Sequence, residues 1–141
     1  MASNTATPVK VVTDYFTALS EGRVEDALSY LDPDVTWHQP GNNVFSGVHT
    51  GPDAVNKLIG GMMSVSQGTF AIAPTVPLME NENLVAAPVQ FTGQRDDVTL
   101  DQAGLDLITV RDGKIVTVQL FSADGPAEDA FWGKSASVSN S

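Results

Sequence analysis

Residues 103–122, AGLDLITVRDGKIVTVQLFS, decide the fold class of this chain. The two halves of the stretch, residues 103–110 and 114–122, are rich in Leu, Ile and Val, as β-strands commonly are. Between them stands Asp112-Gly113, a dipeptide typical of tight turns that join antiparallel strands. The stretch therefore predicts a β-hairpin in the C-terminal part of the chain.

One residue does not fit the apolar pattern of the first strand. Asp106 stands between Leu105 and Leu107, with no Lys or Arg adjacent in sequence. A carboxylate in such a strand must be exposed, paired, or kept neutral by its surroundings. The commoner explanation is an exposed Asp on a solvated sheet face, and the alternative is a functional Asp inside a cavity.

The composition is that of one globular domain. The chain has 141 residues, of which 42 % are apolar and 17 % are charged. Its net charge of −10 argues against binding of nucleic acid or of anionic membranes. There is no cysteine and there are only two histidines, His38 and His49, so a thiolate or three-histidine metal site is excluded, and we expect no metal or cofactor.

Targeting signals are not visible in the sequence. The N-terminus lacks the basic and apolar regions of a secretion signal, and no apolar run approaches the length needed to span a membrane. We therefore expect a cytoplasmic protein. Residues 1–7 are expected to form a flexible arm, residues 8–133 the domain, and the Ser-rich residues 134–141 a disordered tail.

The order of expected elements indicates an α+β fold. Helices are expected at residues 8–21, 24–31, 52–67 and 124–132, and strands at residues 35–39, 69–79, 84–91, 103–110 and 114–122. The three N-terminal helices should lie on one face of a curved, largely antiparallel sheet, which makes a cone. The space between such a sheet and its helices is a natural apolar pocket for a small molecule.

Several motifs resemble one known superfamily. They are VVTDYFTAL at residues 11–19, WHQPG at residues 37–41 followed by Gly47 and Gly51, DGKIV at residues 112–116, and the closing Phe131-Trp132. Over about residues 9–132 the chain resembles the NTF2-like superfamily, and within it the branch of ketosteroid isomerases and SnoaL-like polyketide cyclases. The resemblance implies the cone fold, but this fold hosts isomerases, cyclases, hydrolases, dehydratases and binding proteins.

The resemblance also implies roles for individual residues. Tyr15 falls on the oxyanion-binding Tyr of the isomerases, although an aromatic residue at helical spacing is more often part of the core. Asp106 falls on their protonated, hydrogen-bond-donating Asp, if the family hairpin is taken as one residue longer. Gln39 falls on their general-base Asp, and a Gln cannot take a proton from carbon. The chain would therefore keep two donors and lack the base.

Two residues could replace the missing base. His38 adjoins Gln39 and is the only side chain of this region that ordinarily titrates near neutral pH, although a lone strand His is more often structural. Asp124 lies where some SnoaL-like cyclases place an acid/base carboxylate, although an Asp that caps a helix is the commoner explanation. With Tyr15 and Asp106, these two residues complete the set of expected catalytic residues.

The expected substrate-binding residues are mostly apolar. They are Gln39, Trp37, Gln119, Phe121, Phe16 and Met62. Strict alternation along residues 114–122 would turn Thr117, Gln119 and Phe121 toward the cavity. Val116, Val118 and Leu120 would then form an apolar strip on the opposite face, and such a strip predicts a homodimer.

The resemblance implies an enzyme that polarises a carbonyl of a polyketide-like apolar substrate and guides its cyclisation or isomerisation. One alternative is an epoxide hydrolase of the limonene-epoxide-hydrolase type. That family needs an Arg-x-Asp on one strand, but Gly104 stands where the Arg should be, and Arg95-Asp96-Asp97 lies in the expected connection before the strand. A second alternative is a non-catalytic binding protein for an apolar metabolite.

Overall fold

The structure is a computed structural model that describes residues 7–133. In chain order, its elements are α1 Pro8–Ser20, α2 Val24–Leu28, β1 Leu31–Gln39, β2 Gly47–Thr50, α3 Pro52–Val65, β3 Ala71–Pro74, β4 Met79–Asn81, β5 Leu84–Arg95, β6 Val98–Arg111, β7 Lys114–Ser122 and α4 Gly125–Trp132. Of the expected N-terminal arm only Thr7 is described, and the expected tail at residues 134–141 lies outside the described residues.

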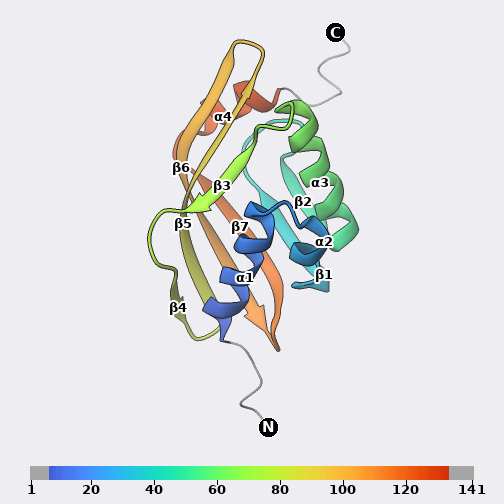
Figure 1. Ribbon diagram of the computed structural model, residues 1–141, viewed down its shortest axis with the longest axis vertical. Helices are drawn as coiled ribbons and strands as arrows, with labels where there is room; N and C mark the ends of the chain where they lie inside the picture. Colours follow the sequence, from blue (N-terminus) through green and yellow to red (C-terminus); the bar gives the residue numbers. More distant parts are fainter. Residues whose placement is uncertain (1–6, 134–141) are drawn as a thin grey trace.

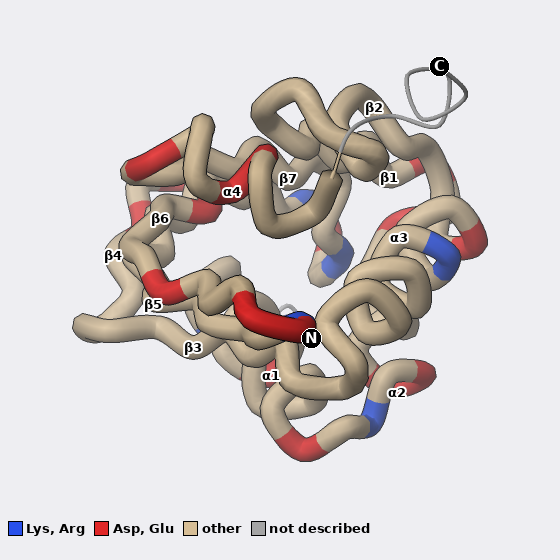
Figure 2. The backbone as a smooth tube through the Cα atoms, turned by 90° about the horizontal axis from the view of Figure 1, so that it is seen from above, with Lys and Arg blue, Asp and Glu red and all other residues tan. Residues whose placement is uncertain are grey.

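The strands form one curved, mixed sheet in the order β2-β1-β7-β6-β5-β3, with β4 paired to β5 (Figure 1). Every pair is antiparallel except β1 with β7, which is parallel. Seen from above, the sheet curves from β5 through β6 and β7 to β1, and α1, α2 and α3 close the open side (Figure 2). The expected α+β cone is confirmed.

The C-terminal hairpin has the predicted form. β6 pairs with β7 from Gly104 opposite Ser122 to Arg111 opposite Lys114. The turn residues Asp112 and Gly113 both have positive φ, 53° and 78°, as a two-residue type I′ turn requires.

The preceding hairpin differs from expectation. The polar stretch expected to connect two strands belongs to β5 and β6 themselves, which remain paired up to Arg95 opposite Val98. Two strands can pair through their backbones without apolar side chains where a hairpin projects into water. The polar composition of this stretch therefore did not indicate a loop. The strand expected at residues 69–79 is instead split into β3 and β4, because Pro74 and Pro77 cannot donate to a ladder.

The helices that flank the sheet are capped as their sequences suggest. The Thr7 Oγ1 accepts from the Lys10 amide at 3.2 Å, and Pro8 opens α1. At the other end of the chain, the Asp124 carboxylate accepts from the Ala127 amide at 3.1 Å and starts α4. The two helices bring aromatic side chains to the core, among them Phe16 on α1 and Trp132 on α4.

The two faces of β7 are the reverse of those expected. Val118 is buried and Leu120 reaches the interior, whereas Gln119 is exposed and Phe121 is half exposed. The cause is a bulge, because Val110 pairs with Ile115 but the next pair is Thr109 with Thr117. The extra residue in β7 reverses the alternation beyond it, so the predicted outer strip of Val118 and Leu120 faces inward.

Candidate functional site

A cavity of about 450 Å³ lies between the concave face of the sheet and the helices. Its walls come from α1, α2, β1, α3, β3, β5, β6, β7 and α4. Seven of the ten residues expected at the site line it: Tyr15, Phe16, Trp37, Gln39, Met62, Asp106 and Phe121. Phe121 is 50 % exposed, so only part of it borders the interior.

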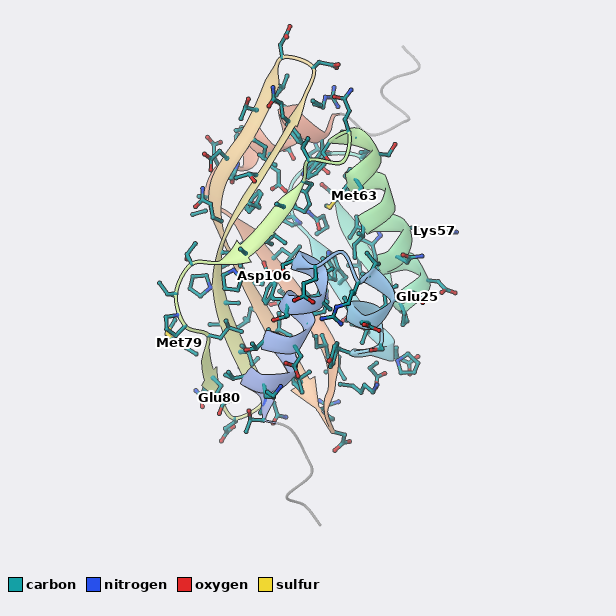
Figure 3. The ribbon with its side chains drawn as sticks, in the orientation of Figure 1. Glu25, Lys57, Met63, Met79, Glu80 and Asp106 are labelled. Atoms are coloured by element: carbon teal, nitrogen blue, oxygen red, sulfur yellow. The ribbon has the colours of Figure 1, made fainter. Side chains whose placement is uncertain are left out.

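Asp106 is buried in the middle of the sheet (Figure 3). Its neighbours in the ladder are Ala87 on β5 and Leu120 on β7, both of which are apolar. Only 6 % of the residue is exposed, and this burial raises the pKa of Asp106 from an ordinary 3.8 to about 7. At and below neutral pH the carboxyl therefore holds a proton in a large fraction of molecules and can donate it in a hydrogen bond.

Tyr15 faces the same cavity from α1. It is 2 % exposed, and burial raises the pKa of its hydroxyl, with the nearby charge of Asp106 as the second cause. Because this pKa is raised, the residue is a phenol at neutral pH. Both residues line the cavity, and no side-chain hydrogen bond within residues 7–133 involves the Tyr15 hydroxyl or the Asp106 carboxyl. Both groups are free to bind a polar atom in the cavity.

Gln39 adds a third donor. The Trp37 Nε1 donates to the Gln39 Oε1 at 2.9 Å, and both residues are buried on the inner face of β1. An indole N–H can only donate, which fixes the amide so that its oxygen faces Trp37. The amide nitrogen remains for a ligand.

Three of the expected site residues do not line the cavity. His38 lies on the opposite face of β1, where it pairs with Val48 and Gln119, because strand side chains alternate. Gln119 is exposed as a result of the bulge in β7. Asp124 accepts from the Ala127 amide as the cap of α4, and neither Asp124 nor His38 lines the cavity.

Sequence analysis missed three polar residues of the cavity wall, Ser20, Ser122 and Glu128, of which Glu128 on α4 is the ionisable one. It is 4 % exposed, and both of its oxygens are held: Ser122 Oγ donates to Oε1 at 2.5 Å and Trp132 Nε1 donates to Oε2 at 3.0 Å. A usable signal was present in the sequence. Glu128 stands three and four residues before Phe131 and Trp132, which puts it on the same inward face of a helix.

The described part of the chain, residues 7–133, contains no group of three or more His, Asp or Glu side chains arranged to hold a metal ion. None of the helices described here is both long enough and apolar enough to cross a membrane.

Asp106 should make the fold less stable as the pH rises from about 4 to about 7. In this window the folded chain keeps a proton on Asp106 that the unfolded chain has lost, because the folded pKa of about 7 exceeds the ordinary 3.8. Urea unfolding of Asp106→Asn and wild type at several pH values measures the effect. As the pH rises from 4 to 8, the unfolding free energy of Asp106→Asn should increase relative to that of the wild type.

Asp101→Asn, an exposed position on the same strand, is the matched control and should show no such trend. A difference between Asp106→Asn and wild type that is constant with pH would contradict a buried acid at Asp106.

The fold is a small α+β cone, in which helices packed on the concave face of one curved sheet enclose a mainly apolar cavity (Figure 2). Residues 12–118 match the model of the SnoaL-like domain, and the chain belongs to this family, a branch of the NTF2-like superfamily that includes cyclases and isomerases. An uncharacterized protein of Mycobacterium tuberculosis is 29 % identical over 117 residues, which cover 83 % of this chain and 89 % of that protein.

Solved structures agree on the fold. A protein of unknown function with a cystatin-like fold from Xanthomonas campestris has a TM-score of 0.87 and 47 % identity, covering 92 % of this chain and all of that one. TerC, co-crystallized with polyporic acid, has a TM-score of 0.79 at 18 % identity, covering 89 % of this chain and 98 % of TerC. At that identity the likeness to TerC establishes the fold alone.

Proposed function

We propose that the protein is a small-molecule enzyme of the SnoaL-like type, which cyclises or isomerises a polyketide-like apolar substrate by polarising one of its carbonyl groups. The observation that carries the proposal is the pair of buried, unpartnered groups on Tyr15 and Asp106 in one mainly apolar cavity. Membership in a family of cyclases and isomerases supports it.

In this proposal the carbonyl oxygen accepts hydrogen bonds from the Tyr15 hydroxyl and from the neutral Asp106 carboxyl. Negative charge grows on that oxygen when a neighbouring C–H bond breaks or when a ring closes. Donors already fixed in a dry site stabilise this charge more than water does. The Gln39 amide, oriented by Trp37, supplies a further contact that positions the substrate.

Epoxide hydrolysis of the limonene type is disfavoured by the surroundings of Gly104. A Cβ atom at this position would lie 2.6 Å from the Phe121 carbonyl oxygen and 2.8 Å from the Phe91 ring, so the family's Arg has no room there. Arg95 and Asp97 lie at the far end of the β5–β6 hairpin and do not line the cavity.

The proposal is tested by the infrared carbonyl band of a bound ketone, 2-acetyl-6-methoxynaphthalene. We expect the C=O stretch to move to lower frequency on binding, because hydrogen bonds weaken the C=O bond. The shift should shrink in Tyr15→Phe and in Asp106→Ala. A band that binding leaves unchanged from its position in an apolar solvent would refute carbonyl polarisation. A shift without turnover of any ketone would favour the binding-protein alternative.

We also predict a homodimer, formed through the outer face of the sheet. The bulge in β7 removes Val118 and Leu120 from this face, and its apolar residues come from other strands: the half-buried Leu105 and Leu107 and the exposed Leu84 and Val48. An apolar face of this kind is unusual on a monomer. Light scattering at micromolar concentration should give twice 14.9 kDa.

Leu107→Glu should reduce the mass to that of a monomer, since a buried charge at the interface has no partner. Lys57→Glu changes charge on the exposed side of α3, away from the sheet, and should leave the mass unaltered (Figure 3). A monomeric wild type would refute the prediction.

A further inference from the structure

The structure holds a second carboxyl in the cavity wall that the proposed carbonyl chemistry does not use. Glu128 is as deeply buried as Asp106, but its situation differs. Asp106 has no partner, whereas Glu128 accepts one hydrogen bond on each oxygen, from Ser122 and from Trp132. Accepting on both oxygens is the behaviour of a carboxylate rather than of a carboxylic acid.

Glu128 retains the capacity to bind a ligand. A carboxylate offers about four acceptor positions, and Ser122 and Trp132 occupy one on each oxygen. Glu128 borders the cavity, so a molecule inside can donate a hydrogen bond to one of the remaining acceptor positions. The two protein donors also hold the side chain in one orientation, which lowers the entropy cost of using it.

The positions of the two carboxyls in the fold set the scale of the ligand. Asp106 pairs with Leu120, and the next inward pair along the ladder is Gly104 with Ser122. Asp106 and Ser122 are therefore diagonal neighbours, with Cα atoms on the order of 7–8 Å apart. Since Ser122 donates directly to Glu128, the Glu128 carboxylate marks a second polar point about one fused ring pair away from Asp106.

The charge of the cavity restricts the ligand further. No Lys, Arg or His of the described residues lines it, and its two ionisable acids are Asp106 and Glu128. The whole chain carries −10, and acidic positions outnumber basic ones over the molecule (Figure 2). A carboxylate or phosphate would enter this cavity without a counter-charge, which is costly.

We propose that Glu128 is the receptor for a hydroxyl group of the substrate, so that the cavity selects uncharged hydroxy-carbonyl compounds and rejects anionic ones. The carbonyl lies at Tyr15 and Asp106, and the hydroxyl at the other end of an apolar ring system donates to Glu128. The inference rests on the proposed function only for the position of the carbonyl group at Tyr15 and Asp106.

Three related probes test the inference: 6-acetyl-2-naphthol, its methyl ether, and 6-acetyl-2-naphthoic acid. They share the ketone and the ring system and differ in one substituent, which is a hydrogen-bond donor, a blocked donor or an anion. Affinities are measured by titration calorimetry. The naphthol should bind about tenfold or more tightly than the ether, as expected for a hydrogen bond to a charged acceptor, and the acid should bind weakest.

Glu128→Gln is the decisive variant, because a Gln can accept from Trp132 and donate to Ser122 while it carries no charge. It should reduce the preference for naphthol over ether and at the same time raise the affinity for the acid. A merely structural role of Glu128 would weaken all three probes together. Asp129→Asn is the matched control, since this neighbour on α4 holds the Asn42 amide and Asn43 outside the cavity, and the order of affinities should not change.

Equal binding of naphthol and ether by the wild type, or parallel losses for all three probes in Glu128→Gln, would overturn the inference. Failure of the proposed function gives a different result. If the acetyl group contributes nothing, 2-naphthol binds as tightly as 6-acetyl-2-naphthol, while the preference that depends on Glu128 persists.

Discussion

Asp106→Ala and Tyr15→Phe should each lower kcat/KM. The corresponding activation free energy should rise by about 2–4 kcal/mol, which is the cost of losing one preorganised donor to a developing oxyanion. Where no turnover is found, the affinity for a ketone should fall in Asp106→Ala and in Tyr15→Phe instead. Asp106→Asn keeps a donor of similar shape, so it should retain much of the activity. The prediction rests on the raised pKa of Asp106 and on the position of both groups in the cavity wall, where no side-chain hydrogen bond within residues 7–133 involves either of them.

The three variants separate the possible roles of Asp106. A general base works as the carboxylate, so Asn would then be as damaging as Ala. Equal and severe losses in both variants would therefore refute the neutral-donor role. Asp101→Asn, on the same strand but exposed, should be near neutral, and circular dichroism of each variant excludes loss of the fold as the cause.

The sequence predicts the architecture well where local chemistry is unambiguous. Asp112-Gly113 marks the hairpin, Thr7-Pro8 marks the start of α1, and the apolar spacing of α1 brings Tyr15 to the interior. The misfit of Asp106 in an apolar strand was also informative. A charged residue with no partner nearby is costly, so its presence indicates either a solvated face or a cavity. The alternation of β6 and the burial of Asp106 resolve this choice in favour of the cavity.

The inward face of β7 could not be predicted, because the bulge after Ile115 has no sequence signature that local rules recognise. One extra residue exchanged the two faces of the strand beyond it. The bulge turns Gln119 away from the cavity and turns Ser122 inward, where it contacts Glu128. The role of Glu128 itself depends on how α4 folds back over the sheet, which is tertiary information. Local rules identify Asp124 as a candidate acid or a helix cap, but they do not show that Glu128 lines the cavity wall.

Trp132→Ala should destabilise the protein by about 3–5 kcal/mol, as is typical for deleting a buried aromatic side chain. Trp132 is 2 % exposed, and its ring forms edge-to-face contacts with Phe131, Phe45 and Phe70 at centroid distances of 4.9, 5.3 and 5.3 Å. The loss combines the cavity left behind with these aromatic contacts. It also removes one of the two donors to Glu128. Urea unfolding measures the change in free energy.

Trp132→Phe separates packing from hydrogen bonding at this position. It keeps an aromatic ring but leaves one Glu128 oxygen without its protein donor, so we expect a smaller loss of about 1–3 kcal/mol. Val76→Ala, at an exposed position between β3 and β4, should change the stability by less than about 0.5 kcal/mol. If Trp132→Ala cost no more than Val76→Ala, then α4 would not be part of the core. The cavity would in that case lack the wall that carries Glu128, and the hydroxyl receptor proposed for that wall would fail with it.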